Sequence, residues 1–139
     1  MYKRYWKKII EPLLLANGYF PSDNYPLTYY KDLLMGIRIE IEVQKWNKSI
    51  RVNINILDLI NTCEEEQFPV EIEWYHLGEF LGNCQYDIWW SVEKPDIKES
   101  FLQIEDVIKN TLLPALDKLE DKEFAQDFIR NIELCCKLN

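Results

Sequence analysis

The stretches IRIEIEVQ (residues 37–44) and IRVNINI (residues 50–56) decide the fold, because both alternate aliphatic and polar side chains without a break. A period of two places the two sets on opposite faces of a β-strand. If Asn47-Lys48 forms the turn, the cross-strand pairs are Val43 with Val52, Ile41 with Ile54, Ile39 with Ile56 and Gln44 with Arg51. One face is then aliphatic and the other polar, so the pattern predicts a half-buried antiparallel hairpin.

Three further stretches are predicted as strands around this hairpin. Residues 26–33, with Tyr29-Tyr30, form the first, after a loop over residues 20–24. Residues 70–75 and residues 86–92 both alternate with a period of two, and the glycine-containing segment 76–83 between them is typical of a long turn.

Helical periodicity appears at both ends of the sequence. Residues 2–17 carry apolar side chains on one helix face, with Gly18 as the stop and Pro12 expected to kink the helix or shift its start. A second helix begins at Ile97 after Asp96 as N-cap, and Pro114 should break or kink it.

Asp121 is predicted to cap a last helix. Its apolar face is expected to consist of Phe124, Phe128, Ile132 and Cys135. The order of helix, strands and helices predicts one α+β domain over residues 1–139, built as an antiparallel four- to five-stranded meander. The N-terminal helix and two C-terminal helices should pack on its aliphatic face.

Length and composition agree with one intracellular domain. The chain has 139 residues, 47% of them hydrophobic, which is enough for one core. No apolar stretch approaches the ~20 residues of a membrane helix, and the start is too polar for a secretory signal. We therefore expect a cytoplasmic protein without membrane association, and we expect its four cysteines to be free thiols.

Charge is distributed unevenly along the sequence. Residues 1–60 carry nine Lys/Arg and six Asp/Glu, whereas residues 61–139 carry seven and eighteen, within a net charge of -8. The acidic second half would repel phosphate backbones, so we expect no nucleic acid as partner. A basic protein is the partner that this charge favours.

The sequence offers no motif for a metal, a cofactor or a nucleophile. His76 is the only histidine, the cysteines show no C-x-x-C spacing, and Gly78 and Gly82 lack the neighbours of a phosphate loop. We expect no metal, no cofactor and no catalytic residue. A pair of catalytic carboxylates stays open, because sequence does not fix the distance between two side chains.

The polar face of the predicted sheet is the candidate site. Five side chains are expected there as a partner-binding surface: Glu71, Glu73, Tyr75, Asp87 and Trp89. Tyrosine and tryptophan among carboxylates are typical of recognition surfaces, although a solvated outer face would have a similar composition. A ligand pocket near His76 and Trp89 is the alternative site.

Several short signatures carry a resemblance to a known family. These are Gly18-Tyr19-Phe20, Tyr29-Tyr30, Gln44 at a strand end, Tyr86-Asp87-Ile88-Trp89-Trp90 and Leu112-Leu113-Pro114. Over residues 2–120 the chain resembles the bacterial domain-of-unknown-function family 4304, which implies an α+β fold and no catalytic residue.

Together these features favour a non-enzymatic protein-binding domain. Immunity proteins that neutralise a basic bacterial toxin have this size and acidity, by analogy of type only. The alternatives are a small-ligand-binding domain and an enzyme of unrecognised type.

Overall fold

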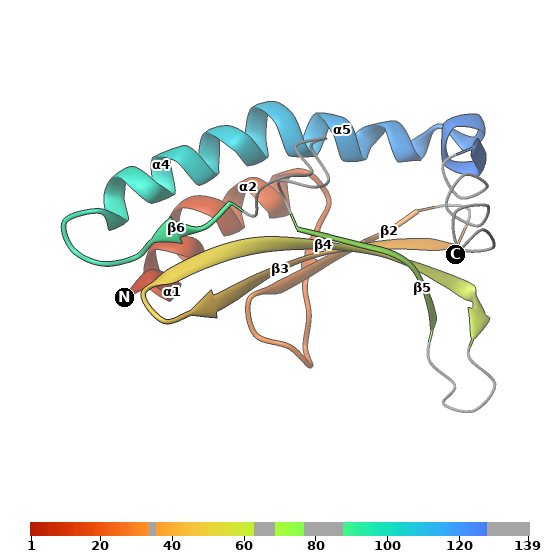
Figure 1. Ribbon diagram of the computed structural model, residues 1–139. Helices are drawn as coiled ribbons and strands as arrows, with labels where there is room; N and C mark the ends of the chain where they lie inside the picture. Colours follow the sequence, from red (N-terminus) through yellow and green to blue (C-terminus); the bar gives the residue numbers. More distant parts are fainter. Residues whose placement is uncertain (34–35, 63–68, 77–87, 128–139) are drawn as a thin grey trace.

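The computed structural model describes residues 1–33, 36–62, 69–76 and 88–127. In these residues an antiparallel sheet lies beneath helices from both ends of the described chain, all on one face (Figure 1). The strands are β1 (Phe20–Pro21), β2 (Thr28–Asp32), β3 (Ile37–Trp46), β4 (Ser49–Thr62), β5 (Pro69–His76) and β6 (Trp90–Ser91). The predicted α+β arrangement is confirmed.

The central hairpin has the predicted register. Val43 pairs with Val52, Ile41 with Ile54, Ile39 with Ile56 and Gln44 with Arg51. The turn falls at Asn47-Lys48, where Asn47 adopts a φ of 55° that asparagine tolerates in a two-residue hairpin turn. β3 continues two residues past its alternating stretch, to Trp46, and β4 extends beyond its own at both ends.

The strands β1 to β5 follow one another across the sheet, as expected for a meander. Two details differ from the sequence prediction. The expected loop at residues 20–24 contains β1, which pairs Phe20 with Tyr30. The predicted strand 86–92 is reduced to β6, which pairs Ser91 with Ser49 on β4 rather than with β5.

Competition for one strand edge explains the short length of β6. On the same side of β4, β5 pairs with the backbone from Asn53 onward, so only the beginning of β4 is left for β6. Residues 77–87, which hold the rest of the predicted strand, lie outside the described residues.

The N-terminal helical segment consists of α1 (Tyr2–Tyr5), a π-helical turn η1 (Trp6–Ile10) and α2 (Glu11–Ala16). Gly18 ends it with a φ of 87°, and Tyr19 N–H donates to the Leu14 carbonyl, as the stop signal predicted. Pro12 stands in the first turn of α2, where a missing N–H does little harm.

The C-terminal segment repeats this pattern. It consists of α4 (Ile97–Val107), a π-helical turn η2 (Ile108–Leu112), α5 (Leu113–Asp117) and a 3₁₀ turn η3 (Lys118–Glu120). A break or a kink was expected at Pro114. The helical segment is not broken there: η2 precedes the proline, and Pro114 stands in the first turn of α5. A π-helical turn has wider, i→i+5 hydrogen bonding. Before a proline, this bonding accommodates the backbone N–H that the proline lacks.

The predicted helix caps were partly correct. Asp121 caps the next helical turn, since its Oδ1 accepts a bond from Phe124 N–H at 2.9 Å. Asp96 precedes α4 as expected, but its carboxylate accepts from the Ser91 hydroxyl at 3.1 Å instead of capping the helix.

Of the apolar face predicted for the last helix, Phe124 alone lies within the described residues, and it is not buried as expected. Phe124 is 44% exposed, whereas Ala125 is fully buried beside the core. Phe128, Ile132 and Cys135, the other members of that face, lie outside the described residues.

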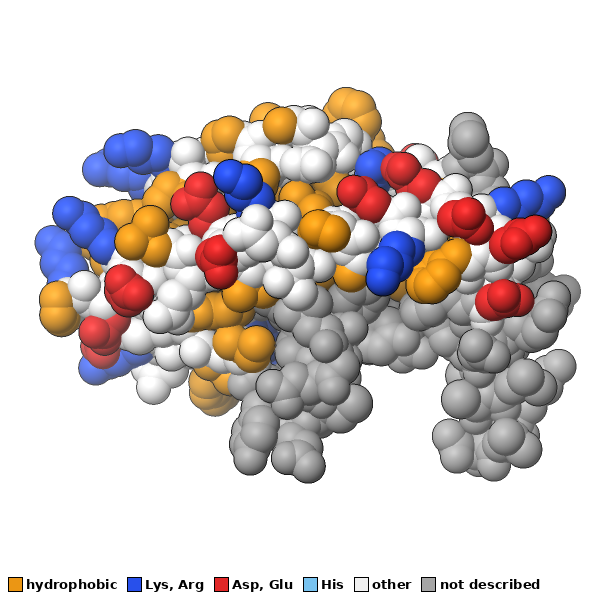
Figure 2. All heavy atoms as spheres, turned by 90° about the horizontal axis from the view of Figure 1, so that it is seen from above, with side chains coloured by type: hydrophobic (Ala, Val, Ile, Leu, Met, Phe, Trp, Pro, Cys, Tyr) orange, Lys and Arg blue, Asp and Glu red, His pale blue; other side chains and the backbone are white. Residues whose placement is uncertain are grey.

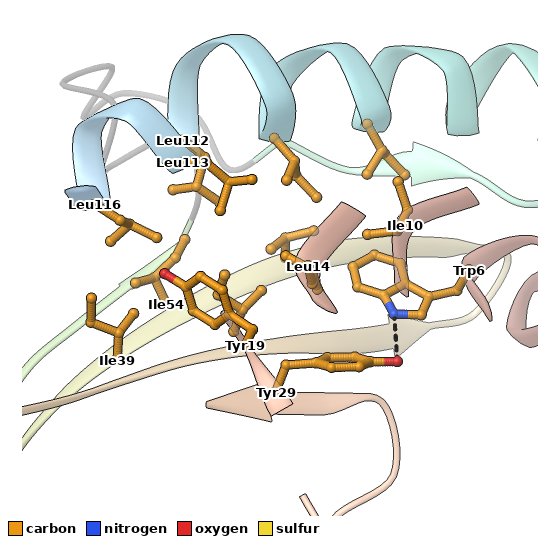
Figure 3. Close-up of a cluster of buried hydrophobic side chains, with 14 of the residues drawn as sticks. Trp6, Ile10, Leu14, Tyr19, Tyr29, Ile39, Ile54, Leu112, Leu113 and Leu116 are labelled. Carbon is orange, nitrogen blue, oxygen red and sulfur yellow. Dashed lines mark hydrogen bonds between the residues drawn. The ribbon is translucent and has the colours of Figure 1, made fainter. Parts of the chain in front are cut away.

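The core lies between the helices and the aliphatic face of the sheet (Figure 3). Trp6, Ile10 and Leu14 come from the first helical segment, and Leu112, Leu113 and Leu116 come from the second. They pack above the isoleucines of β3 and β4. Burial of this apolar area makes the main favourable contribution to the free energy of packing the two layers together.

Candidate functional site: the outer face of the sheet

The described residues place no helix on the polar side of the sheet, which we call the outer face. On β3 and β4 its side chains alternate with the core residues, and most are half-buried rather than fully exposed. The described side chains of the outer face include Tyr30, Arg38, Glu42, Gln44, Arg51, Asn53, Asn55 and Trp89. Partial burial of polar groups requires hydrogen-bond partners, which most of these residues find among themselves.

A cross-strand network lies on the outer face in the half of the β3–β4 hairpin nearest the turn. The Gln44 amide oxygen accepts from Arg51 Nε at 2.8 Å and from Asn53 Nδ2 at 3.0 Å. The same Asn53 nitrogen donates to Glu42 Oε1 at 3.2 Å. The hairpin register causes these contacts, because it sets Gln44 opposite Arg51 and Glu42 opposite Asn53. Asn53 is only 1% exposed, so the network is fixed in place.

Trp89 packs against this network from the neighbouring segment. The carbon at the centre of the Arg51 guanidinium lies 4.7 Å from the centroid of the Trp89 ring, a cation–π contact. Trp89 is 36% exposed, whereas Trp90 is 6% exposed and belongs to the core. The predicted alternation of these two residues is therefore confirmed, although the strand there covers only Trp90–Ser91.

A second stack of this kind lies near the β1 edge. Phe20 packs against Tyr30 with ring centroids 6.0 Å apart, and the Arg38 guanidinium carbon lies 4.4 Å from the Tyr30 centroid. Arg38 also binds both Asp32 oxygens, at 2.6 and 3.0 Å. These hydrogen bonds raise the pKa of Arg38, so the group carries its charge permanently.

Sequence reasoning missed the second stack. Phe20 had been predicted in a loop, and its pairing with Tyr30 depends on β1, which is only two residues long. The two adjacent tyrosines were the available signal, since adjacent strand residues point to opposite faces. Tyr29 is buried, whereas Tyr30 is half-buried on the outer face.

The remaining predicted site residues are placed only in part. Glu71, Glu73, Tyr75 and His76 belong to β5, but their side chains lie outside the described residues, as does Asp87. The backbone register pairs Glu71 with Leu57, Glu73 with Ile56, Tyr75 with Ile54 and His76 with Asn53. A register shift between Ile56 and Leu57 interrupts the ladder there.

The described residues contain no group of three or more His, Cys, Asp and Glu side chains arranged to hold a metal ion. All four cysteines lie outside them. Among the described helices, none combines the length and the hydropathy that crossing a bilayer demands.

A scan against protein-family models, a search of curated proteins and a search of solved structures each found no match.

Proposed function

We propose that this domain binds another protein through its outer face, with Trp89 as the aromatic anchor. The observation that carries the proposal is the Trp89–Arg51 contact, in which a partly exposed tryptophan lies over a guanidinium on a face that no described helix covers. Tryptophan, tyrosine and arginine dominate the binding energy of protein interfaces, and this face has all three.

The hydrogen-bond network supports the proposal because it reduces the conformational entropy that would be lost on binding. Arg51 and Asn53 are already held by Gln44 before any partner arrives. Immobilising a flexible side chain at an interface costs about 0.5–1.5 kcal/mol, and a side chain that is already fixed avoids most of this cost. The outer face therefore resembles a preorganised binding surface more than a mobile solvated one.

Charge sets the expected class of partner. The net charge of -8 favours a basic protein, and an immunity-type role against a basic toxin is one form of this function. On the described part of the face the charges nearly balance, since Arg38 and Arg51 lie among Asp32, Glu40 and Glu42. We therefore assign the steering to the net charge and the specificity to the aromatic and arginine groups.

Affinity capture from the native host tests this function. Immobilised wild-type protein should retain a basic protein that Trp89→Ala fails to retain. Leu102→Ala is the matched control, because Leu102 is 58% exposed on α4, in the helix layer. Equal capture by wild type, Trp89→Ala and a third variant, Arg51→Ala, would exclude the outer face as the binding surface.

One observation favours small-ligand binding as the second candidate. Asn55 Oδ1 is buried on the outer face and has no hydrogen-bond partner among the described residues, and such an acceptor would suit a ligand donor group. Mass spectrometry of small molecules released from the native protein tests it. A compound that is lost on Asn55→Leu but kept on Leu102→Ala would favour this candidate over protein binding.

A further inference from the structure

Basic side chains gather at one end of the molecule, at the tip of the β3–β4 hairpin and the start of the first helical segment. The described members of this basic end are Lys3, Arg4, Lys7, Lys8, Lys45 and Lys48, all exposed. Lys45 Nζ lies 5.7 Å from the Tyr2 ring centroid, which places the hairpin tip against α1. Figure 2 shows lysine and arginine at this end of the helix layer.

Carboxylates do not cancel this charge. Glu93 pairs with Lys48 at 3.0 Å, and Asp96 and Glu99 follow nearby together with Lys94 and Lys98. Including these residues, the end carries eight cations and three carboxylates. For Lys3, Arg4, Lys7, Lys8 and Lys45, the described residues contain no ion-pair partner within 4 Å.

Acidic residues gather at the opposite end. Residues 117–127 contain Asp117, Glu120, Asp121, Glu123 and Asp127 against Lys118 and Lys122, and Figure 2 shows this acidic group at the far end from the hairpin tip. The 14-residue β4 alone extends roughly 40 Å at about 3.3 Å per residue. This length is several times the ~8 Å Debye length of physiological salt. The charges at one end are therefore screened from those at the other end.

Trp46 adds an apolar group to the basic end. It is 73% exposed, immediately before the turn, with Lys45 and Lys48 on either side of the tip in sequence. A tryptophan among lysines suits the boundary between lipid headgroups and acyl chains, where the ring is desolvated and the ammonium groups meet lipid phosphates.

Whereas the sequence alone led us to expect no membrane association, we propose that the basic end docks on a bilayer that contains anionic phospholipid, with Trp46 entering the interface. Single-stranded nucleic acid would prefer a row of stacking aromatic groups along a basic groove. The hairpin tip instead presents one ring at a projecting turn, which fits a flat charged surface better. The docking is peripheral and reversible.

Vesicle sedimentation tests the proposal. The protein should sediment with vesicles of equal parts phosphatidylcholine and phosphatidylglycerol at low salt. It should not sediment with pure phosphatidylcholine vesicles, and high salt should release it from the anionic ones. The double variant Lys3→Glu with Lys45→Glu removes two cations, each worth about fivefold in binding, so the partition coefficient should fall about 25-fold or more.

A matched pair at the other end controls for net charge. Lys118→Glu with Lys122→Glu makes the same change in total charge at exposed positions of the acidic end, and should leave vesicle binding within about twofold of wild type. Far-ultraviolet circular dichroism of both pairs checks that each variant is folded. Equal losses from the two pairs would mean that only overall charge matters, and would overturn the proposal.

Fluorescence quenching tests the role of Trp46. Lipids brominated in the acyl chain should quench part of the protein's tryptophan fluorescence, and Trp46→Phe should remove that quenching. Phe124→Ala, which removes an exposed ring at the acidic end, should have no effect. Quenching that survives in Trp46→Phe, or binding of a single-stranded oligonucleotide without binding of anionic vesicles, would overturn the proposal.

Discussion

The Trp6 indole N–H donates to the Tyr29 hydroxyl at 3.2 Å (Figure 3), and that hydroxyl donates in turn to Glu11 Oε2 at 2.6 Å. Trp6 is fully buried, and Tyr29 is 2% exposed. This chain of bonds joins the first helical segment to β2 inside the core. The polar groups of this chain lie among apolar side chains, where a buried donor without an acceptor would destabilise the folded state.

Tyr29→Phe should lower the free energy of unfolding by about 1–3 kcal/mol, because it leaves the buried Trp6 N–H without an acceptor. Urea unfolding measures the change. Tyr30→Phe is the control, since the Tyr30 hydroxyl makes no hydrogen bond with the described residues and its ring contacts remain. A smaller loss for Tyr29→Phe than for Tyr30→Phe would contradict the structural role of the chain.

Alkaline pH should destabilise the protein through Tyr19 and Tyr29. Burial, followed by the nearby Asp117 and Glu120 charges, raises the pKa of Tyr19, while burial and the bond to Glu11 raise the pKa of Tyr29. A pKa raised by folding means that the folded state favours the protonated phenol. Its stabilisation is therefore complete below the ordinary tyrosine pKa of about 10 and declines as pH rises above it.

The measurement is the change in unfolding free energy between about pH 8 and about pH 11. Tyr19→Phe should make this decline shallower than in wild type, because one of the two phenols that resist ionisation has been removed. Tyr25→Phe should leave the decline as it is in wild type, since Tyr25 is 67% exposed. An equally steep decline in Tyr19→Phe would show that other groups determine the alkaline limit.

Local pattern was sufficient to predict the hairpin. Ile39, Ile41 and Ile54 specify a face by their period of two, and the Asn47-Lys48 turn specifies the register, so no distant contact was needed. The stop at Gly18 was predictable for the same reason, because it depends on one backbone conformation.

Distant contacts explain what the sequence did not reveal. The short β6 results from β5 taking most of one edge of β4, and residues 86–92 carry no sign of that competition. The Phe20–Tyr30–Arg38 stack needs β1, β2 and β3 in register. The basic end combines the start of the first helical segment with a hairpin tip, so a count along the sequence showed only an excess of positive charge in the first 60 residues.

Ile41→Asp should reduce the free energy of unfolding by several kcal/mol. Ile41 is fully buried opposite Ile54, so the substitution places an unpaired carboxylate in the core. Lys45→Asp, on the same strand but exposed, should change it by less than about 1 kcal/mol. Thermal or urea unfolding of both variants checks this, and comparable losses would be inconsistent with the burial of this face.

A chelator should leave the melting temperature unchanged. The core between the helices and the sheet closes with apolar side chains from both layers, so we expect folding to need no bound ion. Differential scanning fluorimetry with and without EDTA measures this. A decrease of several degrees that zinc restores would show that residues beyond the described ones hold a metal.

Kinetics with an identified protein partner should separate the roles of charge and of Trp89. If the ring is an anchor packed on Arg51, Trp89→Ala removes short-range contacts and should mainly increase the dissociation rate. The acidic net charge acts at long range, so Glu71→Lys with Glu73→Lys should mainly slow association, and added salt should slow it in wild type. Surface plasmon resonance at two salt concentrations resolves the two rate constants. An affinity that is insensitive to Trp89→Ala, to the charge reversal and to salt would leave the outer face as a solvated surface with no part in binding.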